Sequence, residues 1–469
     1  MEDNKFDFGM IGLGVMGSNL LLNMADHGFS VIGYDKNPEK TKAFEASGTK
    51  GTVVKGVNTL EEMIAKLKTP RKLMMLVPAG NPVDSVINDL KPLLQKGDII
   101  IDGGNSHYTD TLRRINELKG VGFHFMGIGI SGGEEGARKG PSIMPGGDEE
   151  AYKEVEPILK AVAAKVNDEA CVGYLGHDAA GHYVKMVHNG IEYSIMQLIS
   201  ECYDLMHHGL QLTNEELHAV FKEWDGGDMK SFLLEITAII FEKKDDKTDH
   251  YLVDMILDKA GAKGTGQWTS EEGLNLAMPI PNIDTAVMMR NLSGLIEERK
   301  EAASLYKTEP QIIEADKKEF INQLRDALYF ATLISYAQGL ALLTVASSDL
   351  KMDIPLPEVV SVWRGGCIIR SAMLDIFKSA YQNKDLKNLL LDNNIAQILK
   401  QKENALQKVV STAAMYNYPS AGLMASLNYF NAYTRKLLPT NLVQAQRDFF
   451  GAHTYQRTDG EGIFHTQWD

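Results

Sequence analysis

The first 35 residues carry the pattern that most restricts how this chain can fold. A short apolar run, Phe6 to Ile11, leads into Gly12-Leu13-Gly14-Val15-Met16-Gly17, and a leucine-rich amphipathic segment follows and ends near Gly28. A second apolar run, Ser30 to Tyr34, ends in Asp35. A glycine-rich turn between a strand and a helix, with a carboxylate about 20 residues further on, is the dinucleotide-binding pattern of a Rossmann fold.

The chemistry of this turn suggests which cofactor is bound. The glycines allow a tight turn and bring the pyrophosphate close to the N-terminus of the helix, where free N–H groups favour anions. Asp35 suits the ribose hydroxyls of NAD and repels the 2′-phosphate of NADP, although the adjacent Lys36 could offer charge to that phosphate. NAD is therefore favoured, with use of both NAD and NADP as the alternative. The predicted cofactor contacts are Gly12, Leu13, Gly14, Val15, Met16, Gly17, Asp35, Lys36, Asn37, Val77, Pro78, Ala79 and Asn105.

Alternating strand and helix patterns continue through residue 178. The expected strands are Lys72 to Val77, Asp98 to Asp102, Phe123 to Ile130 and a last short one at Cys171 to Leu175. This alternation predicts a doubly wound parallel sheet in a dinucleotide-binding domain spanning residues 1–178. Three of these strands end in loops at the sheet edge where such folds bind ligands, namely Val77 to Gly80, Asp102 to Ser106 and Ser131 to Gly136.

After about Asp178 the pattern becomes helical, and it stays helical almost to Leu438. Near its start, Lys185, His188, Asn189 and Glu192 are spaced to lie on one face of a helix. Such a stripe is usually a solvated polar face with a salt bridge. Here Met186, Val187 and Ile191 surround it, and the apolar run continues beyond them. Because burying unpaired charge is costly, these groups are predicted to have a function.

The remaining helical half shows a repeat. Leu198-Ile199-Ser200 precedes Trp224-Asp225-Gly226-Gly227, and Leu333-Ile334-Ser335 precedes Trp363-Arg364-Gly365-Gly366. We infer an internal duplication within an all-helical domain of residues 179–438. An ungapped alignment places Phe320, Gln323, Leu324 and Ala327 opposite the four polar residues, so the scaffold does not need them.

Local patterns mark several features of this half and the segment that follows it. Thr213 with Glu216, and Thr269 with Glu272, are expected to cap helix starts. The charged run Glu242 to Asp249 is expected to be a solvated loop. The turn Lys263 to Trp268 could be only a loop or an anion site. The aromatic tail, residues 439–469, is expected to pack against something, unlike most chain ends.

Composition narrows the class of protein. The net charge of −14 argues against nucleic-acid and acidic-membrane partners. No stretch is expected to reach the roughly 20 apolar residues of a membrane span. Because the N-terminus also lacks a signal-peptide pattern, a cytoplasmic location is expected. Cys171, Cys202 and Cys367 form no CxxC or CxH pattern, so they are predicted to be reduced core residues.

With these motifs in view, the chain resembles the decarboxylating 6-phosphogluconate dehydrogenases of the β-hydroxyacid dehydrogenase superfamily. The resemblance covers essentially the whole chain. It rests on the motifs GLGVMG, IIDGGNS, SGGEEGA, GHYVKMVHNGIEY, AGAKGTGQWT, RGGCIIR and QAQRDFFGAHTY in the family's order.

The resemblance implies oxidative decarboxylation of 6-phospho-D-gluconate to ribulose 5-phosphate in the pentose phosphate pathway. By position, Lys185 would be the general base and Glu192 the acid, and no metal is implied. The tail would reach into a partner subunit, so a homodimer with tail exchange is implied. Around the substrate's carboxylate, hydroxyls and phosphate, the implied residues are Asn105, Ser131, Gly132, Gly133, His188, Asn189, Tyr193, Lys263, Thr265, Arg290, Arg447 and His453.

Three departures from the family pattern bear on these expectations. Asp35-Lys36-Asn37 stands where many relatives have Asn-Arg-Ser/Thr, and Pro78 stands where many have a lysine; both strengthen the expectation of NAD. Gln267 replaces a common lysine, with no predictable direction of effect. The competing interpretations are a non-decarboxylating β-hydroxyacid dehydrogenase, a sugar-nucleotide dehydrogenase, which would need an activated cysteine, and a non-catalytic cofactor-binding scaffold.

Overall fold

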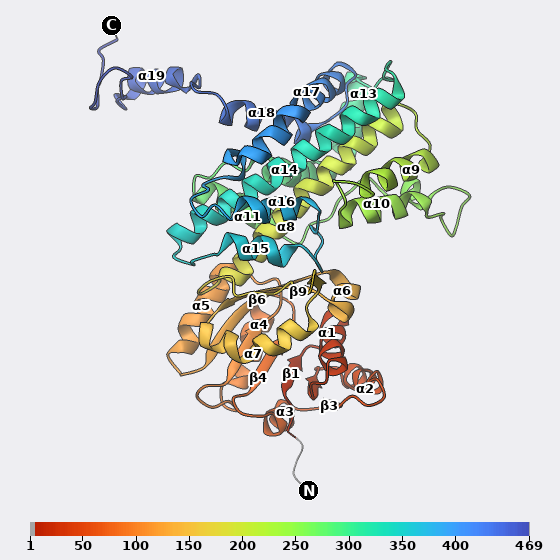
Figure 1. Ribbon diagram of the computed structural model, residues 1–469, viewed down its shortest axis with the longest axis vertical. Helices are drawn as coiled ribbons and strands as arrows, with labels where there is room; N and C mark the ends of the chain where they lie inside the picture. The colour runs from red at the N-terminus through yellow and green to blue at the C-terminus, as the bar shows by residue number, and fades with distance from the viewer. Residues whose placement is uncertain (1–4, 469) are drawn as a thin grey trace.

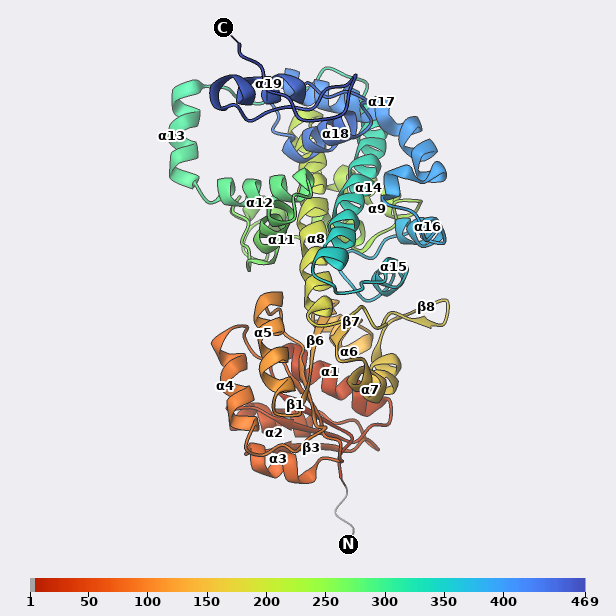
Figure 2. The same cartoon turned by 90° about the vertical axis from the view of Figure 1, so that its left-hand side faces the viewer.

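The computed structural model describes residues 5–468 and shows a sheet domain below a tall helical domain, with the C-terminal tail projecting from the helical end (Figure 1; Figure 2). The ends of the predicted domains, residues 1–4 and residue 469, lie outside the described residues. All strands precede residue 180, and helices follow.

The sheet domain is built on seven strands in the order β3-β2-β1-β4-β5-β6-β7. The first six strands in chain order pair in parallel, and β7 pairs antiparallel with β6. This arrangement confirms the predicted Rossmann-type fold. The strand order changes direction between β1 and β4, which places the topological switch point at the carboxyl ends of these two strands. The strands are β1 Phe8–Ile11, β2 Val31–Tyr34, β3 Val54–Val57, β4 Lys72–Met75, β5 Ile99–Asp102, β6 His124–Ser131 and β7 Ser142–Gly147, with a separate pair, β8 Lys165–Val166 and β9 Glu169–Ala170.

Helices cover both faces of this sheet (Figure 1). Two buried clusters, one on each face, include apolar strand residues such as Met10 and Met74 on one side and Ile11 and Met75 on the other. Successive side chains of a strand point to opposite faces, so apolar residues at consecutive positions seal both sides. The helices are α1 Val15–Asp26, α2 Pro38–Ala46, α3 Leu60–Lys66, α4 Asn81–Leu90, α5 Tyr108–Lys119, α6 Gly133–Lys139 and α7 Glu149–Val162.

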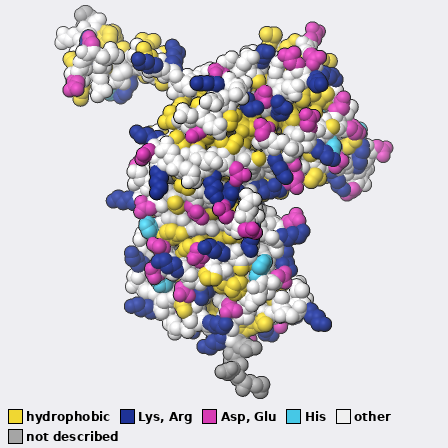
Figure 3. Space-filling model, viewed as in Figure 1, with side chains coloured by type: hydrophobic (Ala, Val, Ile, Leu, Met, Phe, Trp, Pro, Cys, Tyr) yellow, Lys and Arg dark blue, Asp and Glu magenta, His cyan; other side chains and the backbone are white. Residues whose placement is uncertain are grey.

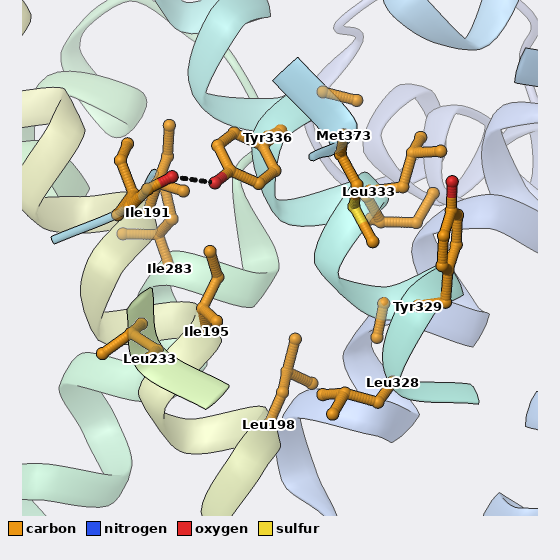
Figure 4. Close-up of a cluster of buried hydrophobic side chains, with 14 of the residues drawn as sticks. Ile191, Ile195, Leu198, Leu233, Ile283, Leu328, Tyr329, Leu333, Tyr336 and Met373 are labelled. Carbon is orange, nitrogen blue, oxygen red and sulfur yellow. Dashed lines mark hydrogen bonds between the residues drawn. The ribbon is translucent and has the colours of Figure 1, made fainter. Parts of the chain in front are cut away.

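Two long helices, α8 and α14, run through the centre of the helical domain and pack on each other (Figure 2). Apolar side chains from both meet others from α10, α12 and α16 (Figure 4). Each long helix is followed by a short one that ends at or next to a tryptophan, Trp224 or Trp363, as the predicted duplication requires. The helices are α8 Ala180–Asp204, α9 Asn214–Asp225, α10 Phe232–Glu242, α11 Thr265–Asn275, α12 Pro281–Ser293, α13 Ile296–Tyr306, α14 Lys317–Asp349, α15 Leu356–Trp363, α16 Met373–Ala380, α17 Asn393–Met415 and α18 Ala421–Tyr433.

Several local predictions were wrong. Cys171 to Leu175 is not a strand: Val172 makes one isolated bridge to Ile143, because the segment crosses β7 at a single point. Thr269 does not cap a helix, since it lies inside α11 and its hydroxyl donates to the carbonyls of Met186 and Thr265. β3 and β7 were missed, because β3 is short and half-exposed and β7 contains proline and two glycines.

Other local predictions were confirmed. Thr213 and Glu216 form a capping box at the start of α9. The run Glu242 to Asp249 is largely exposed, and all three cysteines are free and buried.

The expectation about apolar stretches needs correction. α14 is long and apolar enough, by length and composition, to cross a membrane. Within the structure, 89% of its most apolar window is buried inside the chain. The protein's own helices therefore provide the apolar surroundings that this helix requires.

The tail folds on itself around one carboxylate. It contains α19, Thr440–Gly451, and an antiparallel bridge between Tyr455 and Phe464. Asp448 is fully buried, and its two oxygens accept hydrogen bonds from the backbone of Thr454 and Thr466 and from the rings of His465 and Trp468, all at 2.8–3.0 Å. The tail stands as a separate lobe that exposes hydrophobic side chains (Figure 3), including Leu442, Val443, Phe449, Phe450, Ile463 and Trp468.

Candidate active site

The first turns of α8 cross the sheet at very short range because glycines line the crossing. A Cβ on Gly181 would lie 2.3 Å from the carbonyl oxygen of Gly127, and one on Gly129 would lie 2.3 Å from the Cβ of Lys185. Larger residues would push the helix away from β6. Lys185 is thereby brought beside β6, which ends at Ser131 on the carboxyl edge of the sheet.

The polar stripe of α8 forms a hydrogen-bonded group with its neighbours. Lys185 Nζ lies 3.4 Å from His188 Nδ1, which lies 3.1 Å from Asn189 Oδ1. The hydroxyl of Ser131 lies 3.3 Å from His188 Nε2, and the amide nitrogen of Asn189 donates to Thr265 Oγ1 at 3.1 Å. Three segments that are far apart in the sequence thus meet at one point.

Burial shifts the pKa values of Lys185 and Glu192 in opposite directions. Lys185 is buried, and this burial lowers its pKa, although Glu192 and Cys367 act in the opposite direction. Burial raises the pKa of Glu192, opposed by the positive charges of Lys185 and Arg290. Both shifts favour the neutral form. An uncharged amine and an uncharged carboxylic acid on one helix face can accept and donate protons respectively.

His188 is held neutral between these groups. Its ring is fully buried, and burial together with the nearby Lys185 lowers its pKa. With a proton on Nδ1, the ring donates to Asn189 and leaves Nε2 to accept from Ser131. Trp363 packs edge-on against the ring at 5.8 Å between centroids. The sequence patterns named Trp363 and Cys367 for other reasons and did not place them beside the stripe, because both come from a distant segment at the end of α15.

A second group of predicted residues lies one helical turn further along α8. The guanidinium of Arg290 stacks on the ring of Tyr193 at 3.5 Å and donates to the carbonyl of Gly261 at 2.8 Å. The backbone N–H of Lys263 donates to the Tyr193 hydroxyl at 3.4 Å. Lys263 itself is exposed. A lysine from the turn before α11, a half-buried arginine from α12 and a phenol from α8 therefore lie together on one side of the stripe. This is a suitable set for an anion.

A glycine-lined loop of the sheet domain contacts the segment that follows α15. Gly132 adopts a φ of 116° and begins α6, and a Cβ there would lie 2.6 Å from the carbonyl oxygen of Gly366. Gly133 and Asn105 are exposed at the same edge of the sheet. These positions leave backbone N–H groups and an amide open to a ligand.

The glycine-rich turn has the geometry that a dinucleotide requires. A Cβ on Gly12 would lie 2.5 Å from the carbonyl oxygen of Leu76, and one on Gly17 would lie 2.0 Å from that of Gly12, whereas one on Gly14 would meet nothing within 4 Å. The first and third glycines thus allow close packing, and the second leaves open space at the N-terminus of α1.

A cleft of about 360 Å³ opens beside this turn. Asp35 lies at its wall, where Oδ2 accepts from the Leu13 N–H at 2.8 Å and Oδ1 accepts from the Asn37 N–H at 2.9 Å. Lys40 lies 3.9 Å from the same carboxylate, and sequence patterns had not singled it out. The lining includes Gly12, Gly14, Tyr34, Asp35, Lys36, Lys40, Val77 and Pro78.

Two predicted residues do not join the site within one chain. Arg447 and His453 lie in the tail, exposed, on the lobe that projects from the far end of the helical domain (Figure 1). Within residues 5–468, no group of three or more His, Cys, Asp or Glu side chains is placed to hold a metal ion.

Family comparisons match both halves of the chain. The model described as the NAD binding domain of 6-phosphogluconate dehydrogenase matches residues 7–176, and the one described as the 6-phosphogluconate dehydrogenase C-terminal domain matches residues 181–468. The chain belongs to the 6-phosphogluconate dehydrogenase family. The resemblance drawn from the motifs is therefore confirmed.

Named relatives extend this family assignment over the full length. A Bacillus subtilis protein named as an NADP(+)-dependent, decarboxylating 6-phosphogluconate dehydrogenase is 50% identical over 99% of both chains. An Escherichia coli protein named as a decarboxylating 6-phosphogluconate dehydrogenase is 48% identical over 99% of both. A solved structure of Plasmodium falciparum 6-phosphogluconate dehydrogenase, described with its cofactor NADP+ and its substrate 6-phosphogluconate, has a TM-score of 0.96 and 46% identity, and the match covers 98% of this chain and all of the other.

Proposed function

We propose that this chain oxidatively decarboxylates 6-phospho-D-gluconate to D-ribulose 5-phosphate and CO2, reducing NAD(P)+. The observation that carries the proposal is the buried pair on α8, Lys185 with a lowered pKa and Glu192 with a raised one. Opposite tuning of two titratable groups is how proteins assign a base and an acid within one site. Relatives at about 50% identity over the full length have names that state this activity.

Lys185 is the proposed general base. Its amine takes the proton from the C3 hydroxyl of the substrate as C3 is oxidised to a ketone. Its lowered pKa supports this role, because only the neutral amine has a lone pair to accept the proton. His188, held neutral beside it, adds no positive charge that would repel the lysine once it is protonated.

Glu192 is the proposed general acid. The 3-keto acid loses CO2 while the protonated Lys185 returns its proton to the C3 oxygen, which gives an enediol. The protonated carboxyl of Glu192 then delivers a proton to the carbon that becomes C1 of the product. Its raised pKa supports the protonated state. Asn105, Ser131, Gly132, Gly133, His188 and Asn189 are proposed to bind the carboxylate and hydroxyls of the substrate.

The residues at the sheet edge fit a dinucleotide. The open space at Gly14 and the free N–H groups of α1 suit the pyrophosphate, and Val77 and Pro78 line the cleft beside it. When bound, the dinucleotide supplies the hydride acceptor for the oxidation. We propose NAD as the preferred form, since the Asp35 carboxylate would repel a 2′-phosphate. Lys36 and Lys40 weaken that repulsion, and the B. subtilis relative is named NADP-dependent.

The phosphate end of the substrate is proposed to bind between two subunits. Tyr193, Lys263, Thr265 and Arg290 would come from one chain, and Arg447 and His453 of the partner subunit would complete the set. The exposed apolar side chains of the tail support a partner, because such a surface is costly in water. The proposed assembly is a homodimer with exchanged tails. A cytoplasmic location is proposed as well, in keeping with three free, buried cysteines.

Turnover with both cofactors tests the chemical part of the proposal. Purified protein with 6-phosphogluconate should yield reduced nicotinamide and CO2 in equal amounts, with the higher kcat/KM for NAD+, and Asp35→Asn should shift the preference towards NADP+. Reduced nicotinamide without CO2 would instead indicate a non-decarboxylating dehydrogenase. No turnover with either cofactor would indicate a scaffold, and a higher kcat/KM for NADP+ would overturn the cofactor preference alone.

Mixing two inactive variants tests the shared site. Lys185→Met and Arg447→Ala should each have low activity at limiting substrate. In a hybrid dimer, one site combines an intact Lys185 with an intact Arg447 of the partner subunit. Co-refolded or co-expressed variants should therefore regain about a quarter of wild-type activity, on the statistics of random pairing. Activity equal to the average of the two variants would contradict tail exchange.

A further inference from the structure

A single buried arginine contacts the loops that follow β4 and β5 in the sheet domain, and the first of these loops lines the cofactor cleft. Arg114 lies on α5 and is 1% exposed. Its Nε donates to Asp84 Oδ1 at 2.8 Å, and its Nη2 donates to Asp84 Oδ2 at 3.1 Å and to the carbonyl oxygen of Gly80 at 3.1 Å. On the other side, its Nη1 lies 3.4 Å from the hydroxyl oxygen of Ser106 and 3.5 Å from Asp102 Oδ2.

Both loops carry residues of the candidate site. Gly80 ends the loop after β4, whose Val77 and Pro78 line the cofactor cleft. Asp102 and Ser106 bracket the loop after β5, which holds the exposed Asn105.

The loop after β5 is also held by hydrogen bonds within itself. Asp102 is fully buried and accepts from the Gly104 N–H at 3.0 Å and from the Ser106 hydroxyl at 2.6 Å. The guanidinium of Arg114 ties this preformed turn to the neighbouring one.

The same helix also contacts the first turn of α8, which precedes the polar stripe. Thr111, one turn before Arg114 on α5, places its hydroxyl 2.7 Å from Nδ1 of His182. His182 is buried in the first turn of α8, three residues before Lys185. α5 therefore fixes both cofactor loops and the start of α8 relative to each other.

We propose that Arg114 is a positioning residue that sets the spacing of these two loops, which carry the predicted cofactor contacts Val77, Pro78, Ala79 and Asn105; this rests on the proposed dinucleotide binding. Arg114 does not line the cleft. Its loss would let the loops separate, so the dinucleotide would bind more weakly, while the residues proposed to hold the phosphate end of the substrate stay in place. A displacement on the order of 1 Å in a positioned site is enough for large losses.

The alternative is that Arg114 only stabilises the fold. The guanidinium lowers the pKa of Asp84 to about 2, and removing it would leave Asp102 buried without its positive partner. A purely structural arginine would lower the melting temperature and leave ligand affinities of the folded protein unchanged.

The adjacent Arg113 provides a matched control. Its Nη2 donates to both oxygens of the same Asp84 at 3.0 Å, yet it is half exposed and its other partners, Asp110 and Glu117, lie on its own helix. It shares the carboxylate with Arg114 but touches neither loop.

The experiment measures reduced-dinucleotide binding by nicotinamide fluorescence for wild type, Arg114→Met, Arg114→Lys and Arg113→Met. We expect Kd to rise about ten-fold in Arg114→Met, by less in Arg114→Lys, and to stay within two-fold in Arg113→Met. The KM for 6-phosphogluconate should rise by less than the dinucleotide Kd, because Asn105 is the one proposed substrate contact that lies on these two loops.

Equal Kd values in all folded variants would overturn the proposal, and so would an equal rise in the Kd and in the KM for 6-phosphogluconate. If Arg114→Met does not fold, Arg114→Lys and Ser106→Ala take its place, with a rise of several-fold expected in both. A wild type that binds dinucleotide but does not turn over 6-phosphogluconate would contradict the proposed function and leave the role of Arg114 measurable.

Discussion

α8 and α14 are the two long helices at the centre of the helical domain, and they differ in what they bury. α8 buries His182, Lys185, His188, Asn189, Ser194 and Glu201, four of which can ionise. The buried polar side chains of α14 are Thr332, Ser335 and Gln338, none of which ionises. The helices touch through a hydrogen bond between Ser194 and Ser335 at 2.8 Å. Two long helices in the same core thus differ in their buried polar side chains, which include ionisable groups on α8 and are neutral on α14.

The difference separates the requirements of folding from those of chemistry. Two of the polar groups of α14 have polar partners in the surrounding helices. Gln338 pairs with Asn282 of α12, which also donates to Ser335 and to Ser426 of α18. By contrast, Lys185 has one long contact, to His188. A buried amine with so few partners destabilises the fold, which fits a residue retained for a reaction.

Among variants that test the contrast between α8 and α14, Lys185→Met on α8 is expected to have the largest effect on activity. Loss of the proposed base should lower kcat about 1,000-fold. The melting temperature should not fall and should rise slightly, because a buried amine with one long polar contact is replaced by an apolar chain of similar length. Initial rates and thermal unfolding measure the two effects, with dinucleotide Kd as the control. A marked loss of stability would place Lys185 among the structural groups and remove the contrast.

A smaller effect is expected from Glu201→Gln, which probes the far end of α8. Glu201 accepts from the N–H groups of Gly422 and Leu423 at the start of α18, and burial raises its pKa to about 7. A carboxyl whose pKa is higher in the folded state than the ordinary 4.5 stabilises the fold below pH 4.5, and that contribution is lost as the pH rises to 7. Between pH 5 and 8 the variant should therefore gain stability relative to wild type, by up to about 3 kcal/mol.

Thermal unfolding of both proteins across this pH range provides the measurement. A difference between variant and wild type that does not change with pH would show that Glu201 is ionised throughout. In that case α8 would carry a purely structural charge, which breaks the proposed distinction from α14.

The smallest effect is expected on α14 itself. Gln338→Leu should destabilise the protein by about 2 kcal/mol, because the buried N–H and side-chain oxygen of Asn282 lose their partners. The kcat of the folded enzyme should stay within two-fold. Thermal unfolding and initial rates again measure both quantities. A large loss of kcat with unchanged stability would mean that α14 shares in the chemistry.

Much of this arrangement could be predicted from the sequence, since its signals are local. The strand, the glycines and Asp35 lie within 35 residues and predict the cofactor turn, and a helical spacing of polar residues predicts the stripe on α8. Both elements are present, and the family assignment is confirmed. The roles of Lys185 and Glu192 in the reaction stay predictions.

What could not be predicted depends on contacts between distant segments. β7 lacks a strand pattern because it contains a proline and two glycines. Gly146 is needed at the close crossing with α8, since a Cβ there would lie 2.1 Å from the Gly181 nitrogen. The sequence pattern predicts that Thr269 caps a helix, yet its hydroxyl donates a hydrogen bond to the carbonyl oxygen of Met186. Arg114 gives no sequence signal at all, since its partners come from two other loops.

The closed turn around Asp448 bears on how two chains would come together. All four of its donors come from residues 454–468, so the tail keeps its shape without help from the body of the protein. A preformed part loses little conformational freedom when it docks. Association of the subunits would then be rigid-body docking of a folded tail. No slow step would be needed in which an unfolded segment becomes ordered on the partner subunit.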